Sequence, residues 1–148
     1  MAYRIPQEKE VVKAIENVLV RNPHIRSQAE LYRLVSTELL CMDEEYRIGE
    51  KRIRTIGIAN GLFNLEISYA RTDNVNESGL CPVCGGKLES VRNRTLYWDT
   101  VELMRTCSRC GYAAKSDASR PARYHISRRM HRCPMTGLDL WSRQGNCC

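Results

Sequence analysis

The sequence predicts an α+β fold in two parts, a helical N-terminal part that closes with a strand and a C-terminal part of strands arranged around cysteines. Three observations predict it. Apolar residues recur at helical spacing between residues 7 and 59, and they alternate with polar residues from 62 to 70. Two C-x-x-C-G units follow, at 81–85 and 107–111. We therefore expect the two parts to follow one another along the chain.

The composition indicates a soluble protein with an acidic partner. Of the 148 residues, 43% are hydrophobic and 27% are charged, and the formal net charge is +6. Residues 1–70 hold ten Lys or Arg and ten Asp or Glu, so the positive excess lies in residues 71–148. A basic half favours nucleic acid as a partner. No apolar run approaches about eighteen residues and the first residues lack a secretory signal, so we expect a cytoplasmic protein that does not span a membrane.

Three helices are expected, over residues 7–21, 27–42 and 50–59. The first ends before Pro23, because the residue preceding a proline is pushed out of helical geometry. The second begins at Ser27, since Ser27 and Glu30 form the S-x-x-E pattern of a capping box. The third ends at the Asn60-Gly61 pair and turns its isoleucines inward and its basic residues outward.

A half-buried strand is expected over 62–70, and three helices followed by a strand is the order of a winged helix-turn-helix. The basic helix is the third, as that order requires. The stretch 71–79 has turn formers and no apolar period, so it is interpreted as a linker. Strand-like pieces at 87–93, 100–106 and 122–127 accompany the cysteine units. The predicted division is 1–70 winged helix-turn-helix, 71–79 linker, 80–129 zinc ribbon with a small antiparallel sheet, and 130–148 flexible tail.

The two cysteine units predict one structural metal site. A C-x-x-C turn places two sulfurs on one side of a tight loop, and the glycines that follow, Gly85 and Gly111, suit its positive φ. Two such units supply the four ligands of a tetrahedral zinc ion. The predicted ligands are Cys81, Cys84, Cys107 and Cys110. Four thiolates saturate the ion, so the zinc is expected to be structural.

Other uses of the cysteines remain open. Iron accepts the same thiolate geometry, so the sequence does not separate zinc from iron. A thioredoxin-like site is disfavoured, because neither unit lies at a helix start within a βαβ pattern. Cys41 ends an apolar stripe and is expected to be a small core residue. A second site from His131, Cys133, Cys147 and Cys148 lacks C-x-x-C spacing, and free thiols in a tail are the simpler interpretation.

Two basic groups are candidates for nucleic-acid contact. The third helix presents residues of suitable type for base edges or phosphates, and in a helix-turn-helix this helix enters the major groove. If 122–127 is the edge strand of the ribbon, Arg123 and His125 share one face and Tyr124 and Ile126 the other, which suits phosphate contacts beside the metal. A solvated charged strand is the alternative. The candidate residues are Lys51, Arg52, Arg54, Thr55, Arg123, Arg128 and Arg129.

The stretches GEKRIRTIGI, CPVCGGKLESVRNRTLYWDTVELMRTCSRCGY and RPARYHISRR resemble a group of conserved archaeal proteins. These proteins have an N-terminal winged helix and a C-terminal zinc ribbon and are described as DNA-binding or transcription regulators. The resemblance covers about residues 7–129 and implies a DNA- or transcription-associated role. Archaeal transcription factor E is similar in plan, and the beta subunit of the archaeal initiation factor that delivers the initiator tRNA ends in such a ribbon. Transcript-cleavage ribbons carry an adjacent acidic pair that holds a catalytic metal. Asp99 and Glu102 are not adjacent here, which argues against stimulation of transcript cleavage.

The sequence thus favours a zinc-containing, nucleic-acid-associated protein that is not an enzyme, and specifically a DNA-binding transcription regulator. No Ser/His/Asp set, paired carboxylates or phosphate-binding loop is present. The alternative is a protein-binding adaptor on RNA polymerase or the ribosome. Binding to DNA across a salt series separates the two, because phosphate contacts weaken steeply with salt.

Overall fold

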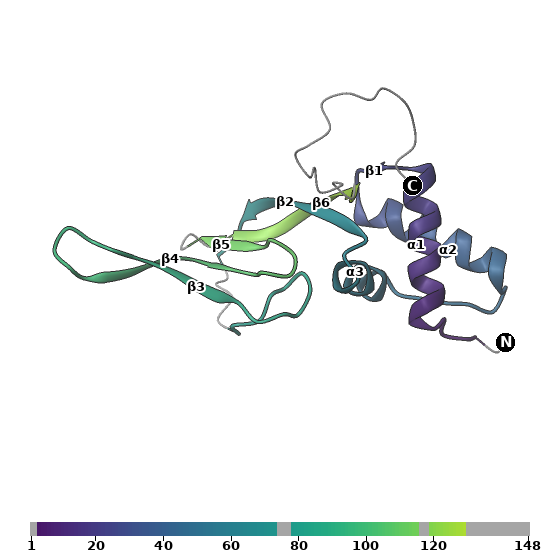
Figure 1. Cartoon of the computed structure of the whole chain (residues 1–148), viewed down its shortest axis with the longest axis horizontal. Helices are drawn as coiled ribbons and strands as arrows, with labels where there is room; N and C mark the ends of the chain where they lie inside the picture. The colour runs from purple at the N-terminus through teal and green to yellow at the C-terminus, as the bar shows by residue number, and fades with distance from the viewer. Residues whose placement is uncertain (1–2, 74–77, 116–118, 130–148) are drawn as a thin grey trace, which may run out of the picture.

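A computed structural model describes residues 3–73, 78–115 and 119–129. This part of the chain is mixed α+β, with three helices and two small antiparallel sheets (Figure 1). The helices are α1 (Glu8–Arg21), α2 (Gln28–Met42) and α3 (Glu50–Ala59). The strands are β1 (His24–Ile25), β2 (Phe63–Arg71), β3 (Glu89–Arg94), β4 (Thr100–Thr106), β5 (Ala113–Lys115) and β6 (Ser119–Arg128).

The three helices begin and end close to where the sequence predicts them. Ser27 caps α2 by accepting a hydrogen bond from the Glu30 amide at 3.1 Å, while the Glu30 carboxylate accepts from the Arg26 amide rather than from Ser27. The helix α3 ends at Ala59 and is followed by Asn60 and Gly61, and the φ of 61° at Gly61 lies in the left-handed region that glycine tolerates. Cys41 near the end of α2 is exposed, so the expectation of a core cysteine is wrong.

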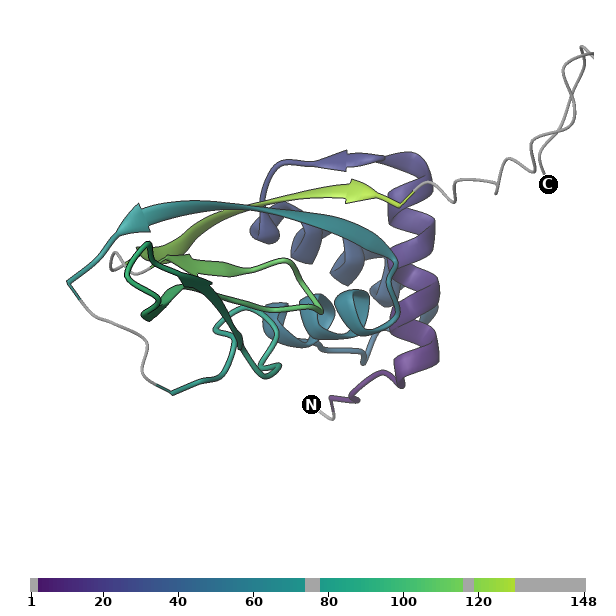
Figure 2. The same cartoon turned by 60° about the vertical axis from the view of Figure 1, so that its left-hand side comes forward.

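The first sheet has the strand order β1-β6-β2, with β6 antiparallel to both neighbours. The pairing of β2 with β6 runs from Phe63 opposite Arg128 to Arg71 opposite Ser119, with one irregularity after Ser68. Figure 2 shows the two long strands lying side by side over the helices. The prediction that residues 122–127 form the edge strand of the ribbon is therefore wrong, because they lie within β6 at the centre of the other sheet.

The main core lies between the helices and the inner face of this sheet. It is built from the apolar stripes of α1 and α2, Ile53 and Ile56 of α3, Phe63 of β2 and Ile126 of β6. Gly57 makes room for the Phe63 ring, since a Cβ there would stand 2.1 Å from a ring carbon. The apolar stripes of the helices therefore pack against the inward-facing apolar residues of the strands, as both sequence patterns predict.

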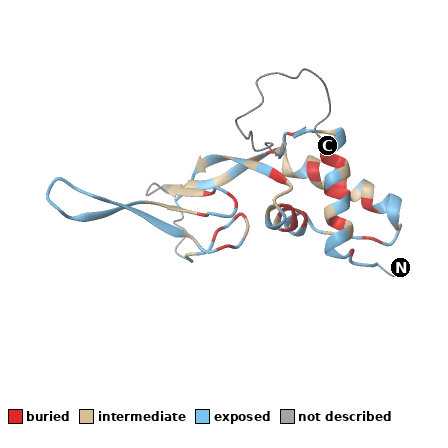
Figure 3. Ribbon diagram, viewed as in Figure 1, coloured by how far each residue is buried: buried red, intermediate tan, exposed pale blue. Residues whose placement is uncertain are grey.

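The second sheet, β3-β4-β5, leaves the body of the protein. The hairpin of β3 and β4 extends away from the helices, and its outer part is exposed throughout (Figures 1 and 3). Every residue from 89 to 103 is exposed. The chain returns from this hairpin through β5 to β6, so the cysteine-bearing segment is inserted between two paired strands of the first sheet. The segment 130–148, including the predicted tail and its cysteines, lies outside the described residues.

Candidate metal centre

Two loops of the same backbone geometry hold the four cysteines. The amide of Cys81 donates to the Gly86 carbonyl at 2.7 Å, and the amide of Gly85 donates to the Cys81 carbonyl at 2.8 Å. The second loop repeats both hydrogen bonds. The Cys107 amide donates to the Tyr112 carbonyl at 2.8 Å, and the Gly111 amide donates to the Cys107 carbonyl at 3.0 Å. The predicted positive φ values are confirmed, at 75° for Gly85 and 73° for Gly111.

The loops bring all four sulfur atoms together. The Sγ atoms of Cys81 and Cys110 are 3.4 Å apart, those of Cys84 and Cys107 are 3.5 Å apart, and all four lie within 4.8 Å of one another. Four sulfurs at about 2.3 Å from a tetrahedral zinc ion stand about 3.8 Å from each other. The donor set and its spacing therefore fit one such ion. Within the described residues this is the one group of three or more potential ligands of this kind.

The surroundings of the cysteines shift their pKa values in different directions. Burial raises the pKa of Cys110 far above its ordinary value and raises the pKa of Cys84. Burial acts in the same direction on Cys107, but hydrogen bonds from the amides of Cys110 and Arg109 outweigh it and lower the Cys107 pKa. A bound cation would offset the burial of the thiolates, and its binding would release protons from the thiols.

The cysteine loops pack against the inner face of the first sheet. Cys81, Cys107 and Cys110 form a buried cluster with Val83 and Tyr112. Side chains of α3, β2 and β6 pack against that cluster, and Ile58 and Leu65 contact the main core as well. The rings of Tyr69 and Tyr112 lie 5.9 Å apart, and the Ala113 amide donates to the Tyr69 hydroxyl at 2.9 Å. The site is thus joined to the helical part by packing and by hydrogen bonds.

Arg54 of α3 contacts the first cysteine loop at this junction. Its side chain was predicted to point outward, and the structure shows that it does not. Its residue is only 9% exposed. Its Nε donates to the Val83 carbonyl in the first cysteine loop at 2.8 Å, and a terminal nitrogen donates to the Gln28 side chain. The guanidinium lies 5.0 Å from the centre of the Tyr124 ring. Arg54 therefore ties α3 to the cysteine loop, and most of its side chain is covered within the fold.

The other basic residues of α3 are accessible. Lys51 and Arg52 are exposed in the first turn, and Arg52 donates to the Pro6 carbonyl at 3.0 Å. Thr55 is half-buried and donates to the Lys51 carbonyl at 2.8 Å, a bond within its own helix. The basic surface of α3 is thus confined to its N-terminal turn.

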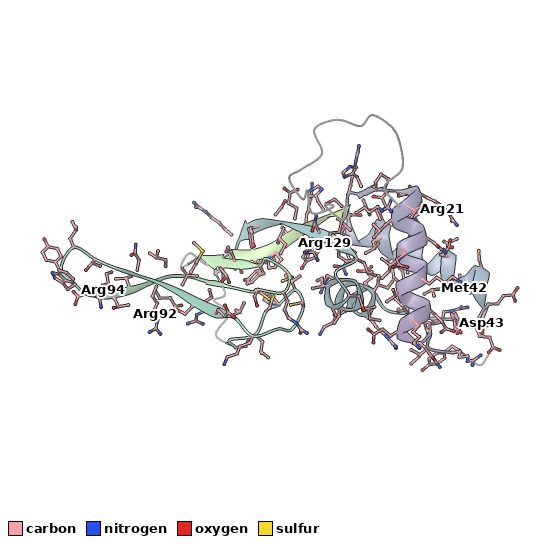
Figure 4. All side chains as sticks on the ribbon, in the orientation of Figure 1. Arg21, Met42, Asp43, Arg92, Arg94 and Arg129 are labelled. Carbon is pink, nitrogen blue, oxygen red and sulfur yellow. The ribbon has the colours of Figure 1, made fainter. Side chains whose placement is uncertain are left out.

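Of the predicted basic residues of β6, Arg123 lies on the face of the sheet opposite the cysteines, whereas Arg128 pairs with the buried Phe63 and has the register of the inner face. Arg123 and His125 are exposed, whereas Tyr124 packs toward the cysteine cluster and Ile126 toward the main core, so the predicted division of the strand's two faces is confirmed. Arg128 and Arg129 are exposed at the end of the strand, and Figure 4 labels Arg129 between the first sheet and α1. Arg123 was expected beside the metal loops, but the sheet stands between them.

The loop between β3 and β4 is a further exposed feature, and it was not predicted from the sequence. The loop between β3 and β4 carries Leu96, Tyr97 and Trp98, all strongly exposed at the far end of the hairpin. A run of three apolar residues between two strands rich in charged residues is the signal that identifies it.

Comparison with protein-family models, curated proteins and solved structures gives no match for this chain. None of the helices in the described part is both long and apolar enough to cross a membrane.

Proposed function

We propose that the protein is a zinc-containing, nucleic-acid-associated protein that regulates transcription by binding DNA. The three helices with the β1-β6-β2 sheet would form its winged helix-turn-helix, and the cysteine loops with β3, β4 and β5 its zinc ribbon. The order of the helices and the sheet on which they pack support the first assignment. The four clustered thiols support the second.

The observation that carries the proposal is the outer face of the first sheet. Arg123 and His125 are exposed at the centre of this face. Arg128 and Arg129 are exposed at the end of β6, where Arg128 has the register of the other face. Glu66 lies opposite His125 in the pairing of β2 with β6, and the neighbouring outward residues Asn64 and Ser68 are neutral. Exposed arginines on a firm sheet suit contacts to phosphate oxygens, which position a protein on nucleic acid without reading its sequence.

The role of the metal in this proposal is structural. Four thiolates fill a tetrahedral shell and leave no position for water or substrate. The zinc would fix the two cysteine loops, and these loops hold the hairpin and support the sheet from its inner side. We therefore propose a binding role and not catalysis for this centre.

A salt series on duplex DNA tests the proposal. Each phosphate contact contributes about −0.9 to the slope of log affinity against log salt, so Arg123→Ala with Arg128→Ala should make that slope shallower by about 2. Lys9 and Lys13 are exposed on α1, away from the sheet, and their double alanine variant is the charge-matched control. Equal slopes for the two double variants, or absence of duplex binding by the parent at low salt, would contradict the proposal.

A protein-binding adaptor on RNA polymerase or the ribosome is the second candidate. One observation favours it: burial of Arg54 under the cysteine loop reduces the surface that α3 offers to a DNA groove. An adaptor would show weak duplex binding with little dependence on salt. The same salt series therefore separates the two candidates.

A further inference from the structure

The tip of the β3–β4 hairpin exposes three consecutive apolar side chains. Leu96 is 98% exposed, Tyr97 is 87% exposed and Trp98 is 80% exposed. Single exposed apolar residues are ordinary on soluble proteins, but aromatic residues gathered at one projecting point indicate an interaction surface. Figures 1 and 3 show that this tip is the part of the hairpin farthest from the helices.

The loop that carries these residues is held by hydrogen bonds. The Thr95 amide donates to the Asp99 carbonyl at 2.8 Å, and the Trp98 amide donates to the Thr95 carbonyl at 3.1 Å. The Asp99 amide donates to the Thr95 hydroxyl at 3.2 Å. The aromatic side chains are therefore presented by a closed turn, so less conformational entropy is lost when a partner binds.

Trp98 occupies a backbone position that stability alone would assign to glycine. Its φ is 69°, in the left-handed region, where a residue with a Cβ costs roughly 1–2 kcal/mol. This position of a three-residue hairpin loop is one that glycine usually fills. Because the Trp98 ring is largely exposed, its burial stabilises the fold very little. A strained conformation at an exposed aromatic residue points to a use outside the folded chain.

One arginine lies beside the aromatic tip. The Arg94 guanidinium is 5.9 Å from the centre of the Trp98 ring, whereas Arg92, two residues farther from the tip, donates from Nε to the Ser90 hydroxyl at 3.4 Å (Figure 4). Of the acidic residues in the hairpin, Asp99 directly follows Trp98, and Glu102 is engaged by the Ser90 hydroxyl at 2.7 Å and by the Arg105 guanidinium at 2.7 Å. The tip therefore combines aromatic planes with the guanidinium of Arg94.

This combination fits an unpaired nucleobase better than it fits lipid. Bases stack on aromatic rings and guanidinium planes, while nearby arginines contact the phosphates. Polar residues flank the loop at once, with Thr95 before it and Asp99 after it. The apolar surface is thus confined to the loop itself. It is large enough to cover one base but does not extend far enough to insert into the acyl region of a membrane.

We propose that Tyr97 and Trp98, together with Arg94, bind unpaired bases of single-stranded DNA or RNA. This inference rests on the proposed nucleic-acid role and deepens it. The sheet face would contact phosphates, and the hairpin tip would stack on bases that are not engaged in a duplex.

The test uses the full, zinc-loaded chain and four probes: an oligothymidine, an oligouridine, an abasic strand of equal length and a blunt duplex. The variant Trp98→Gly removes the ring and relieves the strained φ, so it should unfold at a urea concentration equal to or above that of the parent. Its affinity for the oligothymidine should fall by about fivefold to 150-fold, the range of one lost base stack. Leu96→Ala is the matched control, because Leu96 is also strongly exposed in the same loop but has no aromatic plane, and the affinity of this variant should stay at that of the parent.

Two further readouts make the outcome specific. In a Trp141→Phe background, which leaves Trp98 as the single tryptophan, the oligothymidine should quench the fluorescence and the abasic strand should not. Preference between oligothymidine and oligouridine assigns DNA or RNA as the source of the base. Duplex affinity should be the same for Trp98→Gly and the parent, because that binding depends on the sheet face.

Three results would overturn the inference. If the parent binds the duplex with a steep salt slope, but Trp98→Gly and the parent bind the oligothymidine alike, the hairpin inference fails and the proposed function stands. If the parent binds none of the probes at low salt, both fail. Binding to phosphatidylserine vesicles that depends on Trp98, without binding to the oligothymidine, would assign the tip to a membrane surface instead.

Discussion

Replacing Arg54 with methionine tests whether this residue joins two parts of the fold or contacts DNA. The change replaces the aliphatic part of the side chain with an unbranched apolar chain of similar length and removes the guanidinium. Two hydrogen-bond acceptors, the Val83 carbonyl and the Gln28 side chain, then lose their donor at a site that is only 9% exposed. The stacking of the guanidinium against the Tyr124 ring is lost at the same time.

The magnitude follows from these contacts. A hydrogen bond from a charged donor contributes about 1.5–3 kcal/mol, and a partly desolvated cation–π contact adds about 0.5–2 kcal/mol. The cost of burying the guanidinium, which methionine does not bear, offsets part of this sum. We expect the free energy of unfolding to fall by about 2–4 kcal/mol. An exposed arginine used only for DNA would change it by no more than about 0.5 kcal/mol.

The assay is urea unfolding of the zinc-loaded protein, with duplex binding measured across a salt series on the same samples. Lys51→Met is the matched control, since Lys51 is exposed on the same helix and its loss should leave stability unchanged. Unfolding of Arg54→Met at the same urea concentration as the parent, together with a salt slope shallower by about 1, would refute the structural role and restore the DNA contact.

Three further predictions concern the metal site, the core and acid stability. Cys84→Ser should lose the bound equivalent of zinc, measured by atomic spectroscopy after gel filtration. Cys41→Ser, at an exposed cysteine, is the control and should keep it. A full equivalent of zinc in Cys84→Ser would contradict the assignment. Gly57→Ala should lower the free energy of unfolding by about 1–3 kcal/mol despite the better helix propensity of alanine, because the added Cβ overlaps the Phe63 ring, and Phe63→Leu in the same chain should recover part of the loss. The hydrogen bond from the Tyr46 hydroxyl lowers the pKa of Glu10, so its contribution to stability is complete above the ordinary pKa of a glutamate and is lost as the pH falls through the lowered value. Urea unfolding of Tyr46→Phe and the parent should therefore differ at neutral pH and converge in acid, and a difference that is independent of pH would contradict this linkage.

Local patterns in the sequence predicted the helices and the ligands of the metal site. The S-x-x-E motif located the start of α2, and the glycines after each C-x-x-C unit located the loops, because both depend on hydrogen bonds between residues close in the chain. The alternation of Arg123 and Tyr124 between two faces was predicted for the same reason, since a strand alternates whatever its partner is. The sequence also indicated which four sulfurs belong together, because two units of equal spacing complete one tetrahedron.

The partner of β6, the burial of Arg54 and the side of the sheet on which Arg123 lies were decided only by the tertiary structure. A strand pattern does not specify which strand it pairs with, and β6 pairs with β2 across the whole inserted cysteine segment. That pairing places the cysteine loops against α3, where the Val83 carbonyl meets the Arg54 side chain. The sequence by itself determined the local elements and the ligands, through interactions between near neighbours. Long-range pairing alone decided which surfaces remain open to a partner.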